Sequence, residues 1–210
     1  MNIKNTKIII LDYGSGNVRS VANSLNHLNL DHKISNNNED LEQSTHIILP
    51  GVGSYGASIE KIKKKIDISF LKNEIFLNKK FFLGICVGMQ VLSTKGYEFD
   101  ESVGLDFISG KVTKINTKNL PTIHTGWNEI NIINKECNIL DGLSNKSTFY
   151  FTHGYKFELS NDKHLVSNTN YNECFPSIIQ DKNIYGVQFH PEKSQDSGLK
   201  LLSNFAKLVP

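Results

Sequence analysis

The chain has 210 residues, a formal net charge of +2 at pH 7, 39% hydrophobic residues and 21% charged residues. A chain of this length can bury a core without disulfides or metal ions, and this composition argues against disorder. The small net charge gives no electrostatic footprint for nucleic acid or for an anionic membrane. We therefore expect a single folded domain over residues 1–210.

The cysteines and the apolar runs bear on the cellular compartment. The apolar runs are too short to span a bilayer, and the run at residues 8–11 is too short for the apolar region of a signal peptide. Cys86, Cys137 and Cys174 are an odd number of cysteines without Cys-x-x-Cys spacing. This argues against a disulfide framework and against a zinc site. We expect a cytoplasmic protein with no metal and no cofactor.

In the first half of the chain, short apolar runs alternate with helical patterns. Three runs have the character of buried strands: residues 7–11, 47–49 and 81–85. Each precedes a segment with helical spacing, namely residues 18–28, 54–77 and 87–92. Strand–loop–helix repeats predict a parallel sheet with helices on both faces and a ligand site at the carboxyl ends of the strands. The loops after Leu11, Leu49 and Ile85 would open at that edge.

The second half of the chain has a different pattern. It contains six shorter runs with hairpin-like spacing, at residues 111–115, 129–133, 148–151, 164–167, 177–180 and 184–189. These predict strands that extend the sheet or form a small antiparallel layer. Residues 198–205 resume helical spacing and predict a closing helix. No internal repeat or linker separates the two halves.

Residues 84–88 read Gly-Ile-Cys-Val-Gly, between an expected strand and an expected helix. This setting is typical of a nucleophile elbow, a tight turn that lifts one side chain out of the sheet edge. Flanking glycines let neighbouring backbone approach closely. Cys86 is therefore the candidate nucleophile. The alternative is a small buried hydrophobic residue, which is our interpretation of Cys137 and Cys174 because they lack this setting.

A cysteine nucleophile needs a base, because a neutral thiol reacts poorly and the leaving group must be protonated. His190 ends an expected strand, and Pro191 biases it toward extended backbone. If the chain stays extended, the side chain of Glu192 points the same way as that of His190. A carboxylate there fixes the imidazole tautomer and stabilises the imidazolium. Cys86, His190 and Glu192 form a candidate triad, although each motif alone also has a purely structural interpretation.

The oxyanion formed by attack of a cysteine needs two hydrogen-bond donors. The backbone N–H of Val87 is one candidate. The Pro-Gly-Val-Gly loop at residues 50–53 offers the backbone N–H of Val52 as the other, although it is also an ordinary strand-ending turn. The turn-rich stretch at residues 12–17 suggests a dinucleotide-binding loop. Arg19 stands where that motif needs its third glycine, so the match is weak.

Taken together, these motifs resemble the class I glutamine amidotransferases and, within them, the HisH family of glutaminase subunits. The matching stretches span nearly the whole chain in the family's order: residues 12–21, 49–53, 83–90, 126–128, 149–151, 187–194, 198–199 and 201–202. The resemblance implies an α/β fold of the flavodoxin-like class I glutaminase type. This fold has a mostly parallel central sheet, helices on both faces and added antiparallel strands in the second half.

The resemblance also implies the reaction and the substrate-binding residues. L-Glutamine would be hydrolysed to glutamate and ammonia through a glutamyl thioester on Cys86. Gln90, Glu98 and the backbone around Gly53 and Gly154 would hold the glutamine. Of these, Glu98 is assigned only by its offset from Cys86.

The family implies a heterodimer partner as well. In imidazole glycerol phosphate synthase, the HisF cyclase is a (β/α)₈ barrel that receives the ammonia for histidine biosynthesis. A sheltered route is needed, because ammonia released into neutral water is largely protonated and loses its nucleophilicity.

Two stretches depart from the HisH pattern. Residues 123–128 read Ile-His-Thr-Gly-Trp-Asn where the family usually has Pro-His-Met-Gly-Trp-Asn. Residues 152–155 read Thr-His-Gly-Tyr where it usually has Val-His-Ser-Tyr. Both lie near the glutamine site or the partner-facing side in relatives. They leave open a HisH-like paralogue that supplies ammonia to a HisF-like partner in surface-sugar biosynthesis, an alternative that residues 176–180 also favour.

Two other classes of protein remain as alternatives. A cysteine peptidase or amidase on the same fold would use the same nucleophile on peptides. A non-catalytic flavodoxin-type domain would bind FMN or a nucleotide and would be indifferent to Cys86→Ala. The complete candidate triad in its motif context favours the glutaminase over both.

Overall fold

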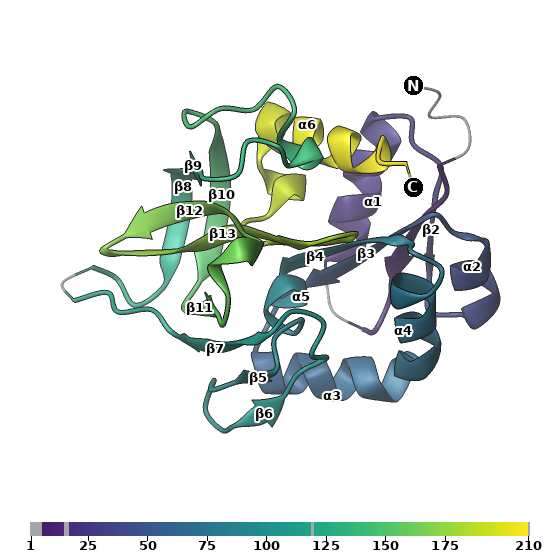
Figure 1. The fold of residues 1–210 in the computed structure, drawn as a ribbon, viewed down its shortest axis with the longest axis horizontal. Coiled ribbons are helices and arrows are strands. Elements are labelled where there is room, and N and C mark those ends of the chain that lie inside the picture. The colour runs from purple at the N-terminus through teal and green to yellow at the C-terminus, as the bar shows by residue number, and fades with distance from the viewer. Residues whose placement is uncertain (1–5, 15–16, 119, 210) are drawn as a thin grey trace.

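A computed structural model describes residues 6–14, 17–118 and 120–209 (Figure 1). Within these ranges, a central eight-stranded sheet has the following order: β2 (His32–Ser35), β1 (Ile8–Leu11), β3 (His46–Gly51), β4 (Phe81–Cys86), β14 (Ile184–Val187), β13 (Glu173–Asp181), β12 (Leu165–Tyr171) and β9 (Asn131–Ile132). The strands from β2 to β14 are parallel, and β13, β12 and β9 continue the sheet in antiparallel pairs.

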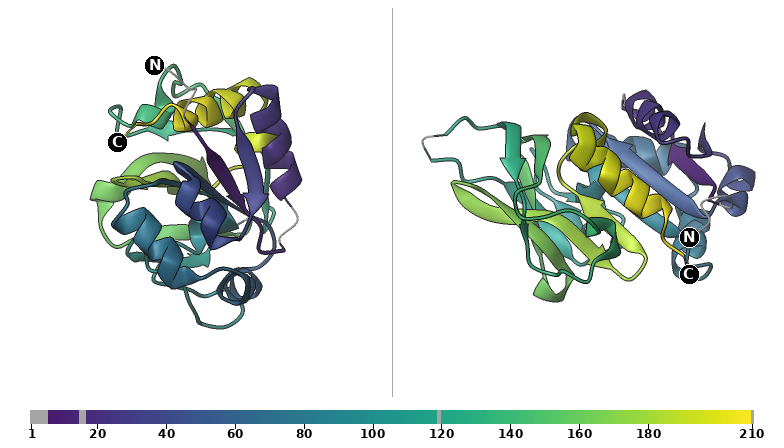
Figure 2. Two further views of the ribbon diagram at one scale, coloured as in Figure 1. Left: turned by 90° about the vertical axis from the view of Figure 1, so that its right-hand side faces the viewer. Right: turned by 90° about the horizontal axis from the view of Figure 1, so that it is seen from above.

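Helices cover both faces of the parallel part of the sheet (Figure 2). Helices α1 (Val18–His27) and α6 (Gln195–Ala206) lie on one face, and α3 (Tyr55–Lys65) and α4 (Ile68–Phe76) lie on the other. The strands between them are apolar on both faces, and all four residues of β1 are buried. Such double burial is what a parallel sheet covered by helices requires. The fold class predicted from the sequence is confirmed.

Two smaller sheets lie beside the central one (Figure 1). One pairs β8 (His124–Glu129) with β10 (Thr148–His153) in antiparallel register. The other has the order β11 (Tyr155–Leu159), β7 (Gly110–Lys114), β5 (Lys95–Gly96) and β6 (Ser102–Val103). The remaining short helices are α2 (Asn38–Gln43), α5 (Val87–Gln90), η2 (Asn138–Leu140), η3 (Asp162–His164) and η4 (Pro191–Lys193). The pairing of β5 with β7 is parallel, so this added layer is not wholly antiparallel.

Several element boundaries differ from the sequence prediction. The single helix expected at 54–77 is two helices, because Ile66 is extended and the Asp67 side chain accepts a hydrogen bond from the N–H of Phe70 at 3.0 Å. That contact is an N-cap, which begins a new helix. The prediction of one strand at residues 129–133 is also wrong. β8 ends at Glu129, Ile130 is buried between the strands, and β9 joins a different sheet.

Several elements formed where no element was expected, among them β2, α2 and β11. β2 is half-exposed and contains a lysine, so it lacks the apolar run that marks a buried strand. α2 has six residues, too few to display a helical period. In β11 only Phe157 is buried and the other positions are partly buried, so the strand shows no clear alternation of buried and exposed residues. None of the helices described here is long and apolar enough to cross a membrane.

Candidate active site

Cys86 sits on a strained turn between β4 and α5. Its backbone has φ +54° and ψ −111°, a region that L-residues rarely adopt and that is common at functional sites. The two flanking glycines are sterically required. A Cβ on Gly84 would lie 2.5 Å from the carbonyl oxygen of Gly88, and a Cβ on Gly88 would lie 1.9 Å from that of Leu49. This is the geometry of a nucleophile elbow.

The thiol of Cys86 is 3% exposed and has two polar neighbours. Its Sγ lies 3.9 Å from the carbonyl oxygen of Thr152 and 3.8 Å from Nε2 of Gln188. The helix that follows, α5, has only four residues instead of the longer helix expected from residue 87. The side chains around the sulfur, rather than a long helix dipole, therefore determine its electrostatic surroundings.

His190 and Glu192 form a buried hydrogen-bonded pair. Nδ1 of His190 lies 2.7 Å from Oε1 of Glu192, and both side chains are 0% exposed. The same Oε1 accepts a hydrogen bond from Nδ2 of Asn17. Among the described residues, Nε2 of His190 has no hydrogen-bond partner. A carboxylate on Nδ1 places the free nitrogen of the imidazole opposite, at Nε2.

The route by which Glu192 reaches His190 differs from the expectation. The backbone of His190 is extended, with φ −101° and ψ 94°, but the chain then turns into the 3₁₀ helix η4. Glu192 therefore contacts the imidazole from the first turn of η4 rather than from a continued strand. Ser194 stabilises this turn, because its Oγ donates to the carbonyl of His190 at 2.6 Å.

The charges around His190 favour its imidazolium form. Burial lowers the pKa of His190, but the negative charges of Cys86 and Glu192 and the hydrogen bond to Glu192 outweigh burial and raise the pKa to about 10. At neutral pH His190 is therefore an imidazolium, and its charge favours a thiolate over a neutral thiol at the neighbouring Cys86. Such a pair supplies both a nucleophile and a proton donor.

A cavity of about 240 Å³ opens beside the sulfur. It is lined by residues from both halves of the chain, most of them candidate site residues: Val52, Gly53, Cys86, Val87, Gln90, Glu98, Thr152, His153, Gly154, Tyr155 and His190. Glu192 lies behind His190. The candidate oxyanion donors Val52 and Val87 are neighbours in the fold, because Gly51 pairs with Cys86 in the register of β3 and β4. The structure thus brings every sequence-predicted site residue to one place.

Two of the candidate substrate residues are already held in position by hydrogen bonds. Nε2 of Gln90 donates to the carbonyl of Tyr155 at 3.0 Å and to Oε1 of Gln188 at 3.1 Å. Oε2 of Glu98 accepts from the backbone N–H of Tyr55, the first residue of α3, at 2.6 Å. A carboxylate fixed at a helix start in this way is favoured by the orientation of the helix dipole.

The two stretches that depart from the HisH pattern face each other. In the register of β8 and β10, His124 pairs with His153 and Thr125 with Thr152. Nδ1 of His124 lies 3.2 Å from Nε2 of His153, and Nδ1 of His153 lies 2.8 Å from the carbonyl of Tyr155. Burial lowers the pKa of His124 to about 4 and is the main cause that lowers the pKa of His153 to about 3. Both imidazoles are neutral at pH 7.

Sequence analysis did not identify two residues that contact the candidate triad. Gln188 contacts Cys86, and Asn17 contacts Glu192. Both lie inside stretches that the sequence singled out, so a signal was present, but neither is a typical catalytic residue type. Ser15 and Gly16, from the turn-rich stretch at residues 12–17, lie outside the described residues.

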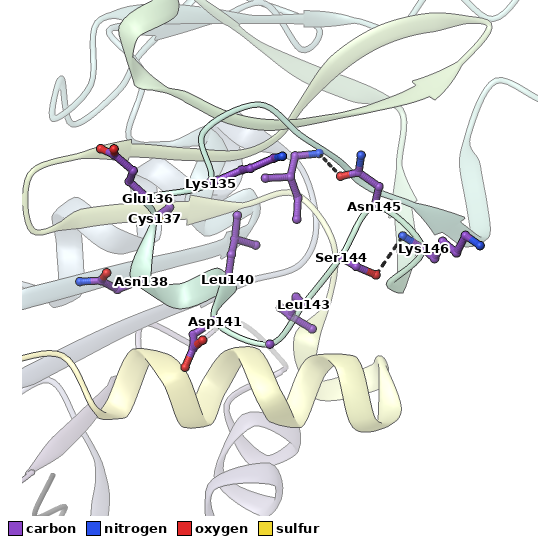
Figure 3. Close-up of a pocket in the computed structure, with 12 residues that line it drawn as sticks. Lys135, Glu136, Cys137, Asn138, Leu140, Asp141, Leu143, Ser144, Asn145 and Lys146 are labelled. Atoms are coloured by element: carbon purple, nitrogen blue, oxygen red, sulfur yellow. Dashed lines mark hydrogen bonds between the residues drawn. The ribbon is translucent and has the colours of Figure 1, made fainter.

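A second cavity, of about 740 Å³, lies away from this site (Figure 3). It is bounded by the segment at residues 132–146, which Figure 3 shows passing over α6. Asn204 of α6 anchors that segment, since its Nδ2 donates to the carbonyls of Ile139 and Asp141. None of the sequence-predicted site residues lines this cavity. Within the described ranges, no group of three or more His, Cys, Asp or Glu side chains is placed to hold a metal ion.

The fold and the site define an α/β protein with an elbow cysteine and a histidine–carboxylate pair at the carboxyl edge of a parallel sheet. The family model for glutamine amidotransferase class-I matches residues 9–208. The chain belongs to the class I glutamine amidotransferase family.

Similar proteins in two bacteria carry more specific names. The chain is 40% identical over 202 residues to imidazole glycerol phosphate synthase subunit HisH 1 of Campylobacter jejuni, a match that covers 96% of this chain and 100% of the relative. It is 41% identical over 210 residues to the subunit HisH of Pelagibacter ubique, covering 96% and 99%.

Solved structures resemble the chain in fold. PurLQS from Thermotoga maritima matches with a TM-score of 0.76 and 17% identity, covering 96% of this chain and 97% of that chain. A glutamine amidotransferase, also from Thermotoga maritima, matches with a TM-score of 0.63 and 15% identity, covering 96% and 82%. At these identities the likeness concerns the fold alone.

Proposed function

We propose that the chain is the glutaminase subunit of an imidazole glycerol phosphate synthase, folded as one domain over residues 1–210 and working in the cytoplasm. The observation that carries the proposal is the cavity that gathers Cys86, His190 and the candidate substrate residues beside one another. The HisH names of the relatives, at about 40% identity over nearly the whole chain, support the specific assignment.

The proposed reaction begins at the sulfur. The thiolate of Cys86 attacks the carboxamide carbon of L-glutamine, and the carbonyl oxygen becomes an oxyanion that the N–H groups of Val52 and Val87 stabilise. The imidazolium of His190 gives its Nε2 proton to the amide nitrogen, which leaves as ammonia. The product of this step is a glutamyl thioester on Cys86.

The second half of the reaction regenerates the enzyme. The neutral imidazole of His190 takes a proton from a water molecule, which attacks the thioester carbon. Collapse of the second oxyanion releases glutamate and restores the thiolate and the imidazolium. Throughout, Glu192 keeps Nδ1 of His190 protonated and offsets the positive charge of the ring.

The substrate is held by groups on both sides of the cavity. In this proposal Gln90 and Glu98 bind the polar ends of glutamine, and the backbone around Gly53 and Gly154 closes around it. Gly53 has φ +105°, a conformation that favours glycine at this turn.

The ammonia requires a sheltered acceptor, and we propose that the heterodimer partner is a HisF-type (β/α)₈ cyclase. The test is glutamate release from glutamine with the host's HisF-type cyclase, with and without its ribulosyl-nucleotide ligand. Strong stimulation that is lost in Cys86→Ala supports the histidine pathway.

A second candidate function is a HisH-like glutaminase that serves surface-sugar biosynthesis. It is favoured by the two stretches that depart from the HisH pattern, because they pair across β8 and β10. Absence of stimulation by an active, folded HisF-type cyclase favours this candidate. Stimulation would then be sought with the HisF-like protein of a surface-sugar pathway.

A further inference from the structure

Gln188 lies between the candidate nucleophile and the wall of the cavity. It follows β14, its side chain is buried, and its backbone N–H donates to the carbonyl of Ser177 at 2.9 Å. Its side-chain amide touches two other site residues, with Nε2 at 3.8 Å from Sγ of Cys86 and Oε1 at 3.1 Å from Nε2 of Gln90. A buried amide must find such partners, because leaving it without hydrogen bonds costs free energy.

A backbone carbonyl sets the direction of these hydrogen bonds. The oxygen of Tyr155 can only accept, so the group of Gln90 that lies 3.0 Å from it must be the NH₂ group. That group has two hydrogens, and the second is donated to Oε1 of Gln188. Gln188 must then present its own NH₂ group to Cys86. The hydrogen-bond chain therefore runs in one direction and ends with a donor at the sulfur.

This direction has one consequence for the nucleophile. A thiolate accepts hydrogen bonds, whereas a neutral thiol can also donate its hydrogen. If Cys86 is a neutral thiol, its Sγ can donate to the carbonyl of Thr152, which lies 3.9 Å away. A donor fixed by Gln188 favours the thiolate over the thiol. Hydrogen bonds to a charged group are stronger than those to a neutral one.

The direction has a second consequence for the substrate. Gln90 lines the cavity and has used both hydrogens of its amide nitrogen on Tyr155 and Gln188. What it offers to a ligand in the cavity is its carbonyl oxygen. Glutamine carries N–H donors in its ammonium group and in its carboxamide, so an acceptor at this position suits it.

We propose that Gln188 is a positioning residue that donates a hydrogen bond to the thiolate of Cys86 and holds the carbonyl oxygen of Gln90 toward glutamine. The part that concerns Gln90 rests on the proposed glutaminase function. The part that concerns Cys86 stands without it, because the reactivity of the sulfur is measurable in the absence of glutamine.

The experiment compares Gln188→Met and Gln188→Glu with the wild-type protein. Iodoacetamide alkylation of each cysteine is followed against pH by peptide mass, and the exposed Cys174 serves as an internal reference for the reagent. Gln188→Met removes the donor, so Cys86 should react about tenfold more slowly at pH 7, with its pH midpoint moved upward. Gln180→Met, a glutamine of β13 outside the cavity, is the matched control and should leave both quantities unchanged.

The KM for glutamine, measured with the partner present, separates the two roles of Gln188. Gln188→Met should raise KM about tenfold, because the amide of Gln90 is then free to rotate. Gln188→Glu keeps an oxygen for Gln90 but places a negative charge beside the sulfur. It should therefore keep KM near the wild-type value and slow alkylation of Cys86 further than Gln188→Met does.

Thermal unfolding of each variant shows whether it is folded, and Gln188→Glu carries the test if Gln188→Met does not fold. Folded variants with an unchanged pH midpoint for Cys86 and an unchanged KM would overturn the proposal and make Gln188 a packing residue. A wild-type protein that releases no glutamate contradicts the proposed function instead. In that case the alkylation of Cys86 still decides whether Gln188 acts on the sulfur.

Discussion

The two halves of the molecule contribute to one site in different ways. The first half supplies parallel strands that end at a common edge, and it carries Cys86 on a turn that backbone sterics fix. The second half supplies β14, which joins the parallel part of the sheet and leads to His190, the turn η4 with Glu192, and antiparallel strands that form the far wall of the cavity. The nucleophile thus comes from a turn in the first half that close backbone contacts fix, and its activating pair comes from the second half.

The stretches that depart from the HisH pattern lie in the second half, away from the elbow. In the first half, Gly51 and Gly88 have other backbone atoms within 3 Å of the position that a Cβ would take. In the second half, β8 and β10 form a separate two-stranded sheet, and the departures from the HisH pattern occur in it or at residues directly next to it. A change in that sheet leaves the elbow intact while it alters the cavity wall around Thr152 and His153.

The largest effect is expected at the elbow itself. Cys86→Ala should lower glutamate release about 10⁴-fold or more, because no other group described in the cavity can form the thioester. The fold should be preserved, which far-UV circular dichroism and thermal unfolding measure. Cys174→Ala, which removes an exposed cysteine, is the matched control and should keep full activity. Undiminished turnover by Cys86→Ala would remove Cys86 from the mechanism.

The next largest loss of activity is expected on changing His190 and Glu192, which the second half supplies. His190→Ala should lower kcat about 10³-fold, because proton transfer to the leaving nitrogen is lost. Glu192→Gln should lower it less, since Glu192 orients and stabilises the imidazolium without transferring a proton. Steady-state assays of both variants with the partner test this order. The reverse order would assign the base differently.

The pH dependence sharpens the same comparison. The pKa of His190 is raised to about 10 in the folded protein, so its imidazolium should persist until the pH approaches that value. Because the folded pKa lies above the unfolded one, the charge pair stabilises the fold fully below pH about 6.5, and that stabilisation is lost as the pH rises through about 10. Glutamate release should fall over the same alkaline range, and in Glu192→Gln the fall should occur at lower pH.

The two halves also differ in how well the sequence predicted them. The buried strands of the first half follow from continuous apolar runs such as residues 8–11, and the elbow follows from a glycine pattern whose steric reason is local. The strand expected at 129–133 failed, because the chain changes sheets at Ile130, and this depends on distant partners. For the same reason the contacts of Gln188 and Asn17 were not predictable, as their partners lie 102 and 175 positions away.

A smaller effect should follow from a single methyl group at the elbow. Gly88→Ala would place a Cβ 1.9 Å from the carbonyl oxygen of Leu49, so α5 and β3 must separate locally. We expect a loss of about 3 kcal/mol in the free energy of unfolding, measured by denaturant titration. Gly56→Ala is the control, because its Cβ would meet only Oγ of Ser102 at 3.2 Å, in a helix that favours alanine. Equal stabilities for the two variants would contradict the packing of the elbow.

The smallest effect is expected from the neutral histidine pair of the second half. The pKa of His124 is lowered to about 4 by burial, so the unfolded chain binds a proton that the folded chain does not between pH 6.5 and 4. Stability should therefore fall as the pH is lowered through this range. His124→Phe keeps a ring that can stack on Phe151 and Tyr171 but cannot titrate. The free energy of unfolding that is lost between pH 7 and pH 5 should therefore be about 1 kcal/mol smaller in this variant than in the wild-type protein. Denaturant titrations at the two pH values measure the difference. An unchanged difference would mean that burial does not lower the pKa of His124, and the sheet of β8 and β10 would then gain a positive charge beside the cavity as the pH falls below about 6.5.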